Sequence, residues 1–128
     1  HYHKVFFVLL SIGGAVVLEL SLKSLIQRAR PENPLIEVSS TFSFPSGHAT
    51  LALVFFSLLI YLFQSHIQNK IFRYGFIAGN ILLILLIGFS RIYLHVHWFT
   101  DVLGGFLLGG LWLALVIYLC KNKNRPLL

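Results

Sequence analysis

Charged side chains are scarce in this chain of 128 residues, because Asp, Glu, Lys and Arg together make up only 11% of it. An ordinary soluble domain carries about 25% charged residues. Hydrophobic residues make up 57% of the chain, so it could not cover its surface with polar groups in water. The composition therefore excludes an ordinary soluble domain and predicts a membrane protein.

The sequence also lacks methionine altogether, and it begins at His1. A complete translation product begins with Met, so we expect the chain to be a fragment or a trimmed domain. The single cysteine, Cys120, cannot form an internal disulfide and therefore leaves the redox compartment undefined. No small-residue cleavage site follows the first apolar run, so no secretory signal peptide is predicted.

Acidic residues are the rarer charge: four Asp and Glu stand against ten Lys and Arg, and the formal net charge is +6. A basic chain can bind nucleic acid, but these basic residues gather at the ends of apolar segments rather than along one face. Aromatic residues form no stacking platform beside them either. We therefore expect no nucleic-acid partner.

Four apolar segments are present in place of a soluble pattern. A membrane-spanning helix needs about 20 residues, within a range of about 17–25. The first and fourth segments meet this length outright, the third meets it with its flanks, and the second needs the stretch from Gly47 to Gln64. The segments predict an all-α transmembrane bundle of four spanning helices, formed as a single membrane-embedded domain over residues 1–128. The four apolar segments are Val5–Leu22, Ala49–Phe63, Gly75–Phe89 (extending to about Leu94) and Val102–Cys120.

Glycines within these segments predict close helix packing, because small residues let two helix backbones approach each other. Gly75 and Gly79 are four residues apart, as are Gly105 and Gly109, and the first segment contains Gly13, Gly14 and Ala15.

Basic residues predict which side of the membrane each connection faces. One group of segment ends carries Lys4, Lys70, Arg73, Lys121, Lys123 and Arg125. The other group carries Lys23, Arg28, Arg30 and Arg91. Three of the second group are assigned to a site below, and without them six basic residues stand against one. The positive-inside rule then places the termini and the Ser65–Tyr74 connection in the cytoplasm.

Lys23 and Arg30 are seven residues apart, which is two helical turns, so they share a face if the first helix continues that far. The residue before a proline is disfavoured in a helix, so we expect this helix to stop at about Arg30, before Pro31. Glu19 lies one turn before Lys23 and is expected to pair with it, although a protonated Glu19 within the bundle is an alternative. Taken alone, both cations could simply extend toward the membrane surface.

Pro45, Ser46, Gly47 and His48 come directly before the second apolar segment. A helix N-terminus presents unpaired backbone N–H groups and the positive end of the helix dipole, which together bind anions. Gly47 would let a ligand approach the backbone closely, and Ser46 offers a hydroxyl. A simple capped helix start is the alternative interpretation.

Arg91, His97 and Asp101 form the sharpest pattern. On a helix, Asp101 lies one turn after His97 and can accept a hydrogen bond from one imidazole nitrogen. This contact would set the tautomer and leave the other nitrogen free to attack a substrate. His95 would point elsewhere, and we interpret it as an interfacial, structural residue.

A metal site is the rival interpretation for histidines near a carboxylate. The chain has only four acidic residues and none of the usual zinc-binding spacings, and the nearby cations would repel a divalent metal. Three cations with two imidazoles favour an anionic ligand instead. Phosphate fits, because phosphoryl transfer depends on neutralising and positioning the phosphoryl oxygens.

Three motifs together resemble the signature of the type 2 phosphatidic acid phosphatase superfamily, which also includes soluble vanadium-dependent haloperoxidases. They are Lys23-x6-Arg30-Pro31, Pro45-Ser46-Gly47-His48 and Ser90-Arg91-x5-His97-x3-Asp101. Membrane members of the superfamily typically have six spanning helices. The resemblance therefore implies that this chain is a fragment of a six-helix membrane phosphatase and lacks the two N-terminal helices.

The resemblance also implies a role for each site residue, with no metal and no cofactor. His97 would attack phosphorus and form a phosphohistidine, and Asp101 would hold its tautomer. His48 would protonate the leaving group and then activate water. The groups implied to hold the phosphoryl oxygens are Lys23, Arg30, Ser46, Gly47 and Arg91.

The expected function is hydrolysis of a lipid phosphate or pyrophosphate in a bacterial inner or plasma membrane, with the active site facing the periplasm or the outside. Phosphatidate, phosphatidylglycerol phosphate and undecaprenyl pyrophosphate are the candidate substrates. Two alternatives stay open at this point. One is a phosphotransferase that uses the same site, and the other is a non-catalytic membrane protein that binds or transports lipids.

Overall fold

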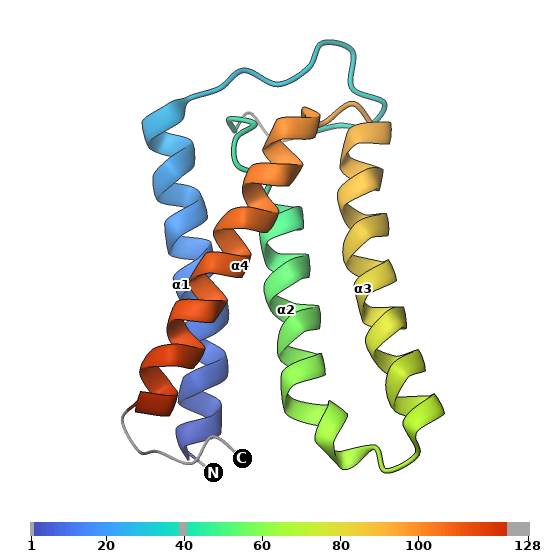
Figure 1. The fold of residues 1–128 in the computed structure, drawn as a ribbon. Helices are drawn as coiled ribbons and strands as arrows, with labels where there is room; N and C mark the ends of the chain where they lie inside the picture. Colours follow the sequence, from blue (N-terminus) through green and yellow to red (C-terminus); the bar gives the residue numbers. More distant parts are fainter. Residues whose placement is uncertain (1, 39–40, 123–128) are drawn as a thin grey trace.

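The computed structural model describes residues 2–38 and 41–122 of the chain, and within these ranges it contains helices and no strand. The elements are α1 (Tyr2–Ile26), α2 (Gly47–Phe63), the short 3-10 helix η1 (Gln64–His66), α3 (Lys70–Tyr93) and α4 (Phe99–Asn122). Figure 1 shows the four long helices running alongside one another, with irregular connections at both ends.

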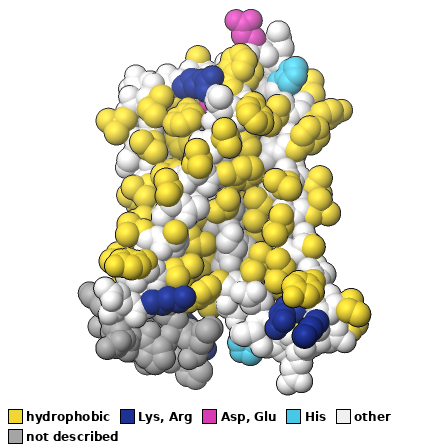
Figure 2. Space-filling model, viewed as in Figure 1, with side chains coloured by type: hydrophobic (Ala, Val, Ile, Leu, Met, Phe, Trp, Pro, Cys, Tyr) yellow, Lys and Arg dark blue, Asp and Glu magenta, His cyan; other side chains and the backbone are white. Residues whose placement is uncertain are grey.

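Four helices of the described chain are long and apolar enough to cross a membrane. They correspond one to one with the four predicted segments, so the predicted all-α transmembrane bundle is confirmed. The second span was the shortest in the sequence, and it reaches 20 residues because η1 continues α2 as far as His66. Hydrophobic side chains cover most of the visible face between charged residues at the two ends (Figure 2), which is the surface that a bilayer requires.

The helix α2 is central, because it packs against each of the other three long helices. A core of buried apolar side chains joins α1, α2 and α4, and its buried members are Phe7, Ala15, Val54, Leu58, Leu113 and Val116. The helix α3 packs mainly on α2. The bundle therefore holds the start of α2 firmly, and this is where the second motif lies.

Glycines bring α4 close to α2, as predicted for one of the two glycine pairs. A methyl group on Gly105 would come within 2.6 Å of the Ser46 carbonyl oxygen, and one on Gly109 within 2.8 Å of the Thr50 carbonyl oxygen. For Gly75 and Gly79 the prediction was wrong within the described chain, because a methyl group on either would meet no atom of another described helix within 4 Å. The same holds for Gly13, whereas Gly14 lies against the Trp112 ring of α4 and Ala15 is fully buried in the core, as predicted for the first segment.

The first helix ends earlier than predicted. Gln27 has a φ of 52°, in the left-handed region, and α1 ends at Ile26 rather than at about Arg30. The Gln27 amide still donates to the Lys23 carbonyl at 3.0 Å, as is common where a left-handed residue closes a helix. Arg30 is consequently positioned by the connecting loop and not by a helix face shared with Lys23.

All three motifs lie at one end of the bundle (Figure 1), as the number of crossings predicts. That end holds the loop from α1 to α2 and the short connection from α3 to α4. The Leu35 amide donates to the Leu94 carbonyl at 3.0 Å and joins these two connections. The other end holds the start of α1, the end of α4 and η1. Two of the basic residues counted for the orientation, Lys123 and Arg125, lie outside the described residues.

Candidate active site

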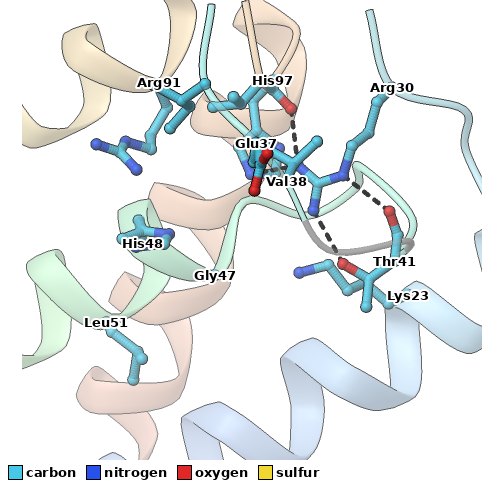
Figure 3. A pocket seen from close by; sticks show the side chains of 12 residues that line it. Lys23, Arg30, Glu37, Val38, Thr41, Gly47, His48, Leu51, Arg91 and His97 are labelled. Atoms are coloured by element: carbon cyan, nitrogen blue, oxygen red, sulfur yellow. Dashed lines mark hydrogen bonds between the residues drawn. The ribbon is translucent and has the colours of Figure 1, made fainter. Parts of the chain in front are cut away.

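A cavity of about 480 Å³ lies at the motif-bearing end of the bundle. It is lined by Lys23, Arg30, Ile36, Glu37, Val38, Thr41, Gly47, His48, Leu51, Arg91, Val96 and His97. Six of the eight predicted site residues are therefore on its wall, contributed by α1, the following loop, α2, α3 and the connection before α4. Figure 3 shows His48 and Arg91 on one side and Arg30 with Lys23 on the other.

Lys23 lies in the last turn of α1 and forms an ion pair with Glu19, one turn earlier. The predicted Glu19–Lys23 pair is thus confirmed. Glu19 is only 7% exposed, and its carboxylate lies against the start of α2. A methyl group on Gly47 would come within 2.8 Å of the Glu19 Oε1 atom, so the glycine is needed for this close approach.

Arg30 is held by three hydrogen bonds. Its Nε donates to the Thr41 carbonyl at 2.8 Å, its Nη2 to the Thr41 hydroxyl at 3.0 Å, and its Nη1 to the Val96 carbonyl at 2.8 Å. These contacts, drawn in part in Figure 3, direct the guanidinium into the cavity. Burial lowers the pKa of Arg30 from its ordinary value, and the charge of Asp101 opposes this. Arginine nevertheless stays protonated in proteins.

His48 and Arg91 face the cavity from two neighbouring helices. His48 is the second residue of α2 and is exposed, beside the unpaired amides at the helix start. Arg91 lies in the last turn of α3, where its Nε donates to the Ser90 hydroxyl at 3.1 Å. The two side chains lie beside one another in Figure 3.

Ser46 does not reach the cavity, which differs from the phosphate contact implied for it. Its side chain is fully buried and caps α2, accepting from the Ala49 amide at 3.5 Å. Its own amide donates to the Asp101 carbonyl at 3.0 Å. An N-cap side chain turns back toward its own helix, so the structure gives the Ser46 hydroxyl a capping contact in place of a ligand contact.

His97 lies on the cavity wall, and Asp101 lies directly behind it. His97 is 5% exposed and Asp101 is fully buried. The Asp101 Oδ2 atom accepts from the Trp98 amide at 2.8 Å and lies 3.5 Å from the His97 Nδ1 atom. His97 precedes α4, and Asp101 lies in the first turn of that helix. The predicted proximity of His97 and Asp101 is therefore confirmed. The two residues are brought together at the start of α4, however, and not on one face of a helix that contains both.

The surroundings of His97 indicate which imidazole nitrogen carries the proton. The Arg30 Nη1 atom lies 3.4 Å from the His97 Nε2 atom. A guanidinium can only donate hydrogen bonds, so this contact favours the tautomer with a lone pair on Nε2. In that tautomer the proton is on Nδ1, which faces the Asp101 carboxylate at 3.5 Å and makes no hydrogen bond among the described residues. Burial lowers the pKa of His97 to about 4, and Arg30 acts in the same direction, while Asp101 opposes it.

Two residues at this end were missed by sequence reasoning. Arg28 was counted only as a basic residue, yet its Nη1 atom donates to the Asp101 Oδ1 atom at 2.8 Å. Glu37 places a carboxylate on the cavity wall among the cations. The buried Asp101 signals that some cation must pair with it, but no local spacing identifies a partner 73 residues away.

His95 is placed as predicted, outside this cavity. It is exposed, has a φ of 53°, and lines a separate depression beside Glu32 and Trp98. Among the residues that the structure describes, no group of three or more His, Cys, Asp or Glu side chains could hold a metal ion.

Comparison with known proteins gives a family and two named relatives. The PAP2 superfamily matches residues 4–125. Phosphatidylglycerophosphatase B of Bacillus subtilis (strain 168) is 39% identical over 122 residues, which cover 94% of this chain and 58% of that protein. An uncharacterized 22.5 kDa protein in the cps region of Klebsiella pneumoniae is 31% identical over 81 residues, or 63% of this chain and 38% of that protein.

A solved structure resembles the whole described bundle. It is the crystal structure of the first transmembrane PAP2 type phosphatidylglycerolphosphate phosphatase from Bacillus subtilis, with a TM-score of 0.83 and 34% sequence identity. The match covers 94% of this chain and 60% of that one. This chain thus spans about three-fifths of the length of the Bacillus proteins that it matches.

The buried, neutral His97 predicts a loss of stability in mild acid. The folded-state pKa of about 4 lies below the ordinary histidine value of about 6.5. As the pH falls between these values, the unfolded chain gains a proton that the folded chain does not, so the free energy of unfolding decreases. The unfolding temperature in detergent should fall less between pH 7 and 4 for His97→Gln than for the wild type. His66→Gln, at the opposite end, should behave like the wild type; an equal fall in all three proteins contradicts the prediction.

Proposed function

This chain belongs to the PAP2 superfamily, and from that premise we propose that it hydrolyses a lipid phosphate through a phosphohistidine, without a metal ion. The observation that carries the proposal is the cavity itself. It brings three cations and two imidazoles from five parts of the chain together at the N-terminus of α2. Such a site neutralises a phosphoryl group with fixed charges, which is the main requirement of phosphoryl transfer.

In the first step, the lone pair of the His97 Nε2 atom attacks phosphorus. The N–P bond forms as the bond from phosphorus to the leaving oxygen breaks, and His48 gives its proton to that oxygen. Lys23, Arg30 and Arg91 neutralise the phosphoryl oxygens. The imidazole becomes positively charged, and the Asp101 carboxylate, 3.5 Å from Nδ1, stabilises that charge.

In the second step, His48 is neutral and takes a proton from water. The resulting hydroxide attacks phosphorus on the side opposite His97, the N–P bond breaks, and inorganic phosphate is released. His97 recovers its neutral form with the proton on Nδ1, and His48 recovers the proton that it donated. One general acid–base residue thus serves both steps, in opposite directions.

The substrate that we propose is a membrane lipid with a terminal phosphate. Apolar side chains share the cavity wall with the charges: Ile36, Val38, Leu51 and Val96. Leu51 is 36% exposed on the outer surface of α2, where acyl chains would lie. The relative named phosphatidylglycerophosphatase B favours phosphatidylglycerol phosphate over phosphatidate or undecaprenyl pyrophosphate.

The site is proposed to face the periplasm or the outside of a bacterial inner membrane. At the opposite end, the described chain carries Lys4, Lys70, Arg73 and Lys121. At the site end, three of the four basic residues line the cavity, and the fourth, Arg28, is paired with Asp101. No unassigned cation therefore remains at the site end of the described chain, and the positive-inside rule supports this orientation.

Hydrolysis is tested by the same substitution at two nearby histidines. Purified full-length protein should release phosphate from phosphatidylglycerol phosphate in detergent with a chelator present. His97→Asn should lower the rate by a factor of about 1,000 or more, because the nucleophile is lost. His95→Asn should retain wild-type activity, since asparagine tolerates the positive φ of that position.

Three results would contradict the proposal in different ways. Loss of activity with chelator would refute the metal-free mechanism, and equal activity of the two variants would refute the role of His97. Phosphate delivered to an added alcohol in preference to water would identify a phosphotransferase.

The orientation is tested by single cysteines in a variant whose Cys120 is replaced by serine. Glu32→Cys lies at the site end and Gln68→Cys at the other, and both positions are exposed. In intact bacterial cells, a thiol reagent that cannot cross the membrane should label residue 32 and not residue 68. Labelling of residue 68 alone would reverse the proposed orientation, and both sites should react after the cells are permeabilised.

A further inference from the structure

Arg28 lies at the site end but outside the cavity, and it contacts the groups behind His97. Its Nη1 atom donates to the Asp101 Oδ1 atom at 2.8 Å and to the Thr100 hydroxyl at 2.6 Å. The guanidinium also lies over the Trp98 ring, 5.6 Å from its centroid. All three partners belong to the start of α4 or to the residue before it. Arg28 therefore joins the loop after α1 to the helix start that carries Asp101.

The charge of Asp101 requires such a partner. Its side chain is fully buried, and a buried carboxylate is costly unless a cation and hydrogen bonds compensate it. His97 is neutral at physiological pH, because its pKa is about 4, so it supplies no positive charge in the resting protein. Among the described residues, the cationic side chain that lies within ion-pair distance of this carboxylate is that of Arg28.

The two carboxylate oxygens of Asp101 have different tasks. Oδ1 accepts from Arg28, while Oδ2 accepts from the Trp98 amide at 2.8 Å and faces the His97 Nδ1 atom at 3.5 Å. The terminal torsion of an Asp side chain is broad and only weakly restricted by itself. With Oδ1 held by Arg28, Oδ2 stays directed at the imidazole.

Arg28 is itself on a supported stretch of loop. The Ser43 amide donates to the Arg28 carbonyl at 2.8 Å. The next carbonyl, that of Ala29, accepts from the Ser43 hydroxyl at 3.0 Å and from the Trp98 indole at 3.1 Å. The backbone that carries the guanidinium is thus tied both to the loop before α2 and to the start of α4.

From these contacts, and resting on the function proposed above, we propose that Arg28 is a positioning residue of the reaction. Its guanidinium neutralises and orients Asp101, so that the proton of His97 stays on Nδ1 and the lone pair of Nε2 faces the phosphoryl group. Arg28 lies outside the cavity, and its side chain contacts Thr100, Asp101 and the Trp98 ring. It differs in this from Lys23, Arg30 and Arg91, which line the cavity.

The kinetic test compares Arg28→Gln and Arg28→Lys with Arg73→Gln. Arg73 is a matched control, because its guanidinium also lies over an aromatic ring, 5.9 Å from that of Tyr74, at the opposite end. For Arg28→Gln we expect kcat to fall about 10–100-fold, by analogy with the loss of hydrogen-bond partners that orient metal-binding histidines. KM should stay unchanged. Arg28→Lys, which keeps the charge, should recover part of kcat, and Arg73→Gln should match the wild type.

A double substitution separates positioning from a purely structural role. If Arg28 acts through Asp101, then Arg28→Gln should cost less than about twofold in a protein that already carries Asp101→Asn, because the two effects are coupled. Full additivity of the two losses would overturn the proposal. So would a rise in KM at constant kcat, which would place Arg28 in ground-state substrate binding.

A nitrogen NMR measurement on histidine-labelled protein tests the same proposal without any substrate. The His97 signals, assigned with His97→Gln, should show a protonated Nδ1 and an unprotonated Nε2 in the wild type. Arg28→Gln should shift both signals toward a tautomer mixture, while the His48 signals stay unchanged. An unchanged His97 tautomer in Arg28→Gln would overturn the proposal. A wild type that releases no phosphate from any lipid would instead refute the proposed function, and the NMR result would still decide the role of Arg28.

Discussion

The buried carboxylate of Asp101 is the group on which the arrangement of this site depends. An ionised side chain inside an apolar bundle costs several kcal/mol unless it is paired. Here it accepts from the Arg28 guanidinium and the Trp98 amide, and the Asp101 carbonyl accepts from the Ser46 amide. One residue thereby fixes the loop after α1, the start of α4 and the start of α2 relative to one another. His97 lies against the same carboxylate, so the proposed nucleophile is positioned by the same set of contacts.

The four cations at this end divide into different tasks, and the division is electrostatic. Lys23 is balanced by Glu19, and Arg28 is balanced by Asp101. Arg30 donates to backbone carbonyls and a hydroxyl, which orient it without cancelling its charge. The Arg91 Nε atom donates to the Ser90 hydroxyl, which likewise leaves its charge in place. A phosphoryl group entering the cavity would thus meet the positive charges of Arg30 and Arg91, next to the unpaired amides at the start of α2. Glu37 is the acidic residue on the same wall. A fixed arrangement of this kind needs little reorganisation during the reaction.

Much of this could be predicted from the sequence, because the constraints are local or periodic. The length of an apolar segment predicts a spanning helix, and the number of crossings predicts which motifs share an end; both were confirmed. The i, i+4 spacing predicted the Glu19–Lys23 pair correctly, because that part of the chain is helical. The extension of α1 to Arg30 was wrong, because a left-handed residue at Gln27 ends the helix. The Arg28–Asp101 pair could not be predicted, since it depends on how a loop folds back over a helix start.

The account as a whole depends on a covalent bond between phosphorus and the Nε2 atom of His97. The most direct measurement is a rapid base quench of the wild-type protein with a lipid substrate that carries a radiolabelled terminal phosphate, followed by peptide mapping. We expect the label on the peptide that contains His97, stable in base and lost in acid as an N–P bond requires, and absent when His97 is replaced by Asn. Steady release of phosphate by the wild type with label on a different residue, or with no labelled peptide at any quench time, would contradict the account.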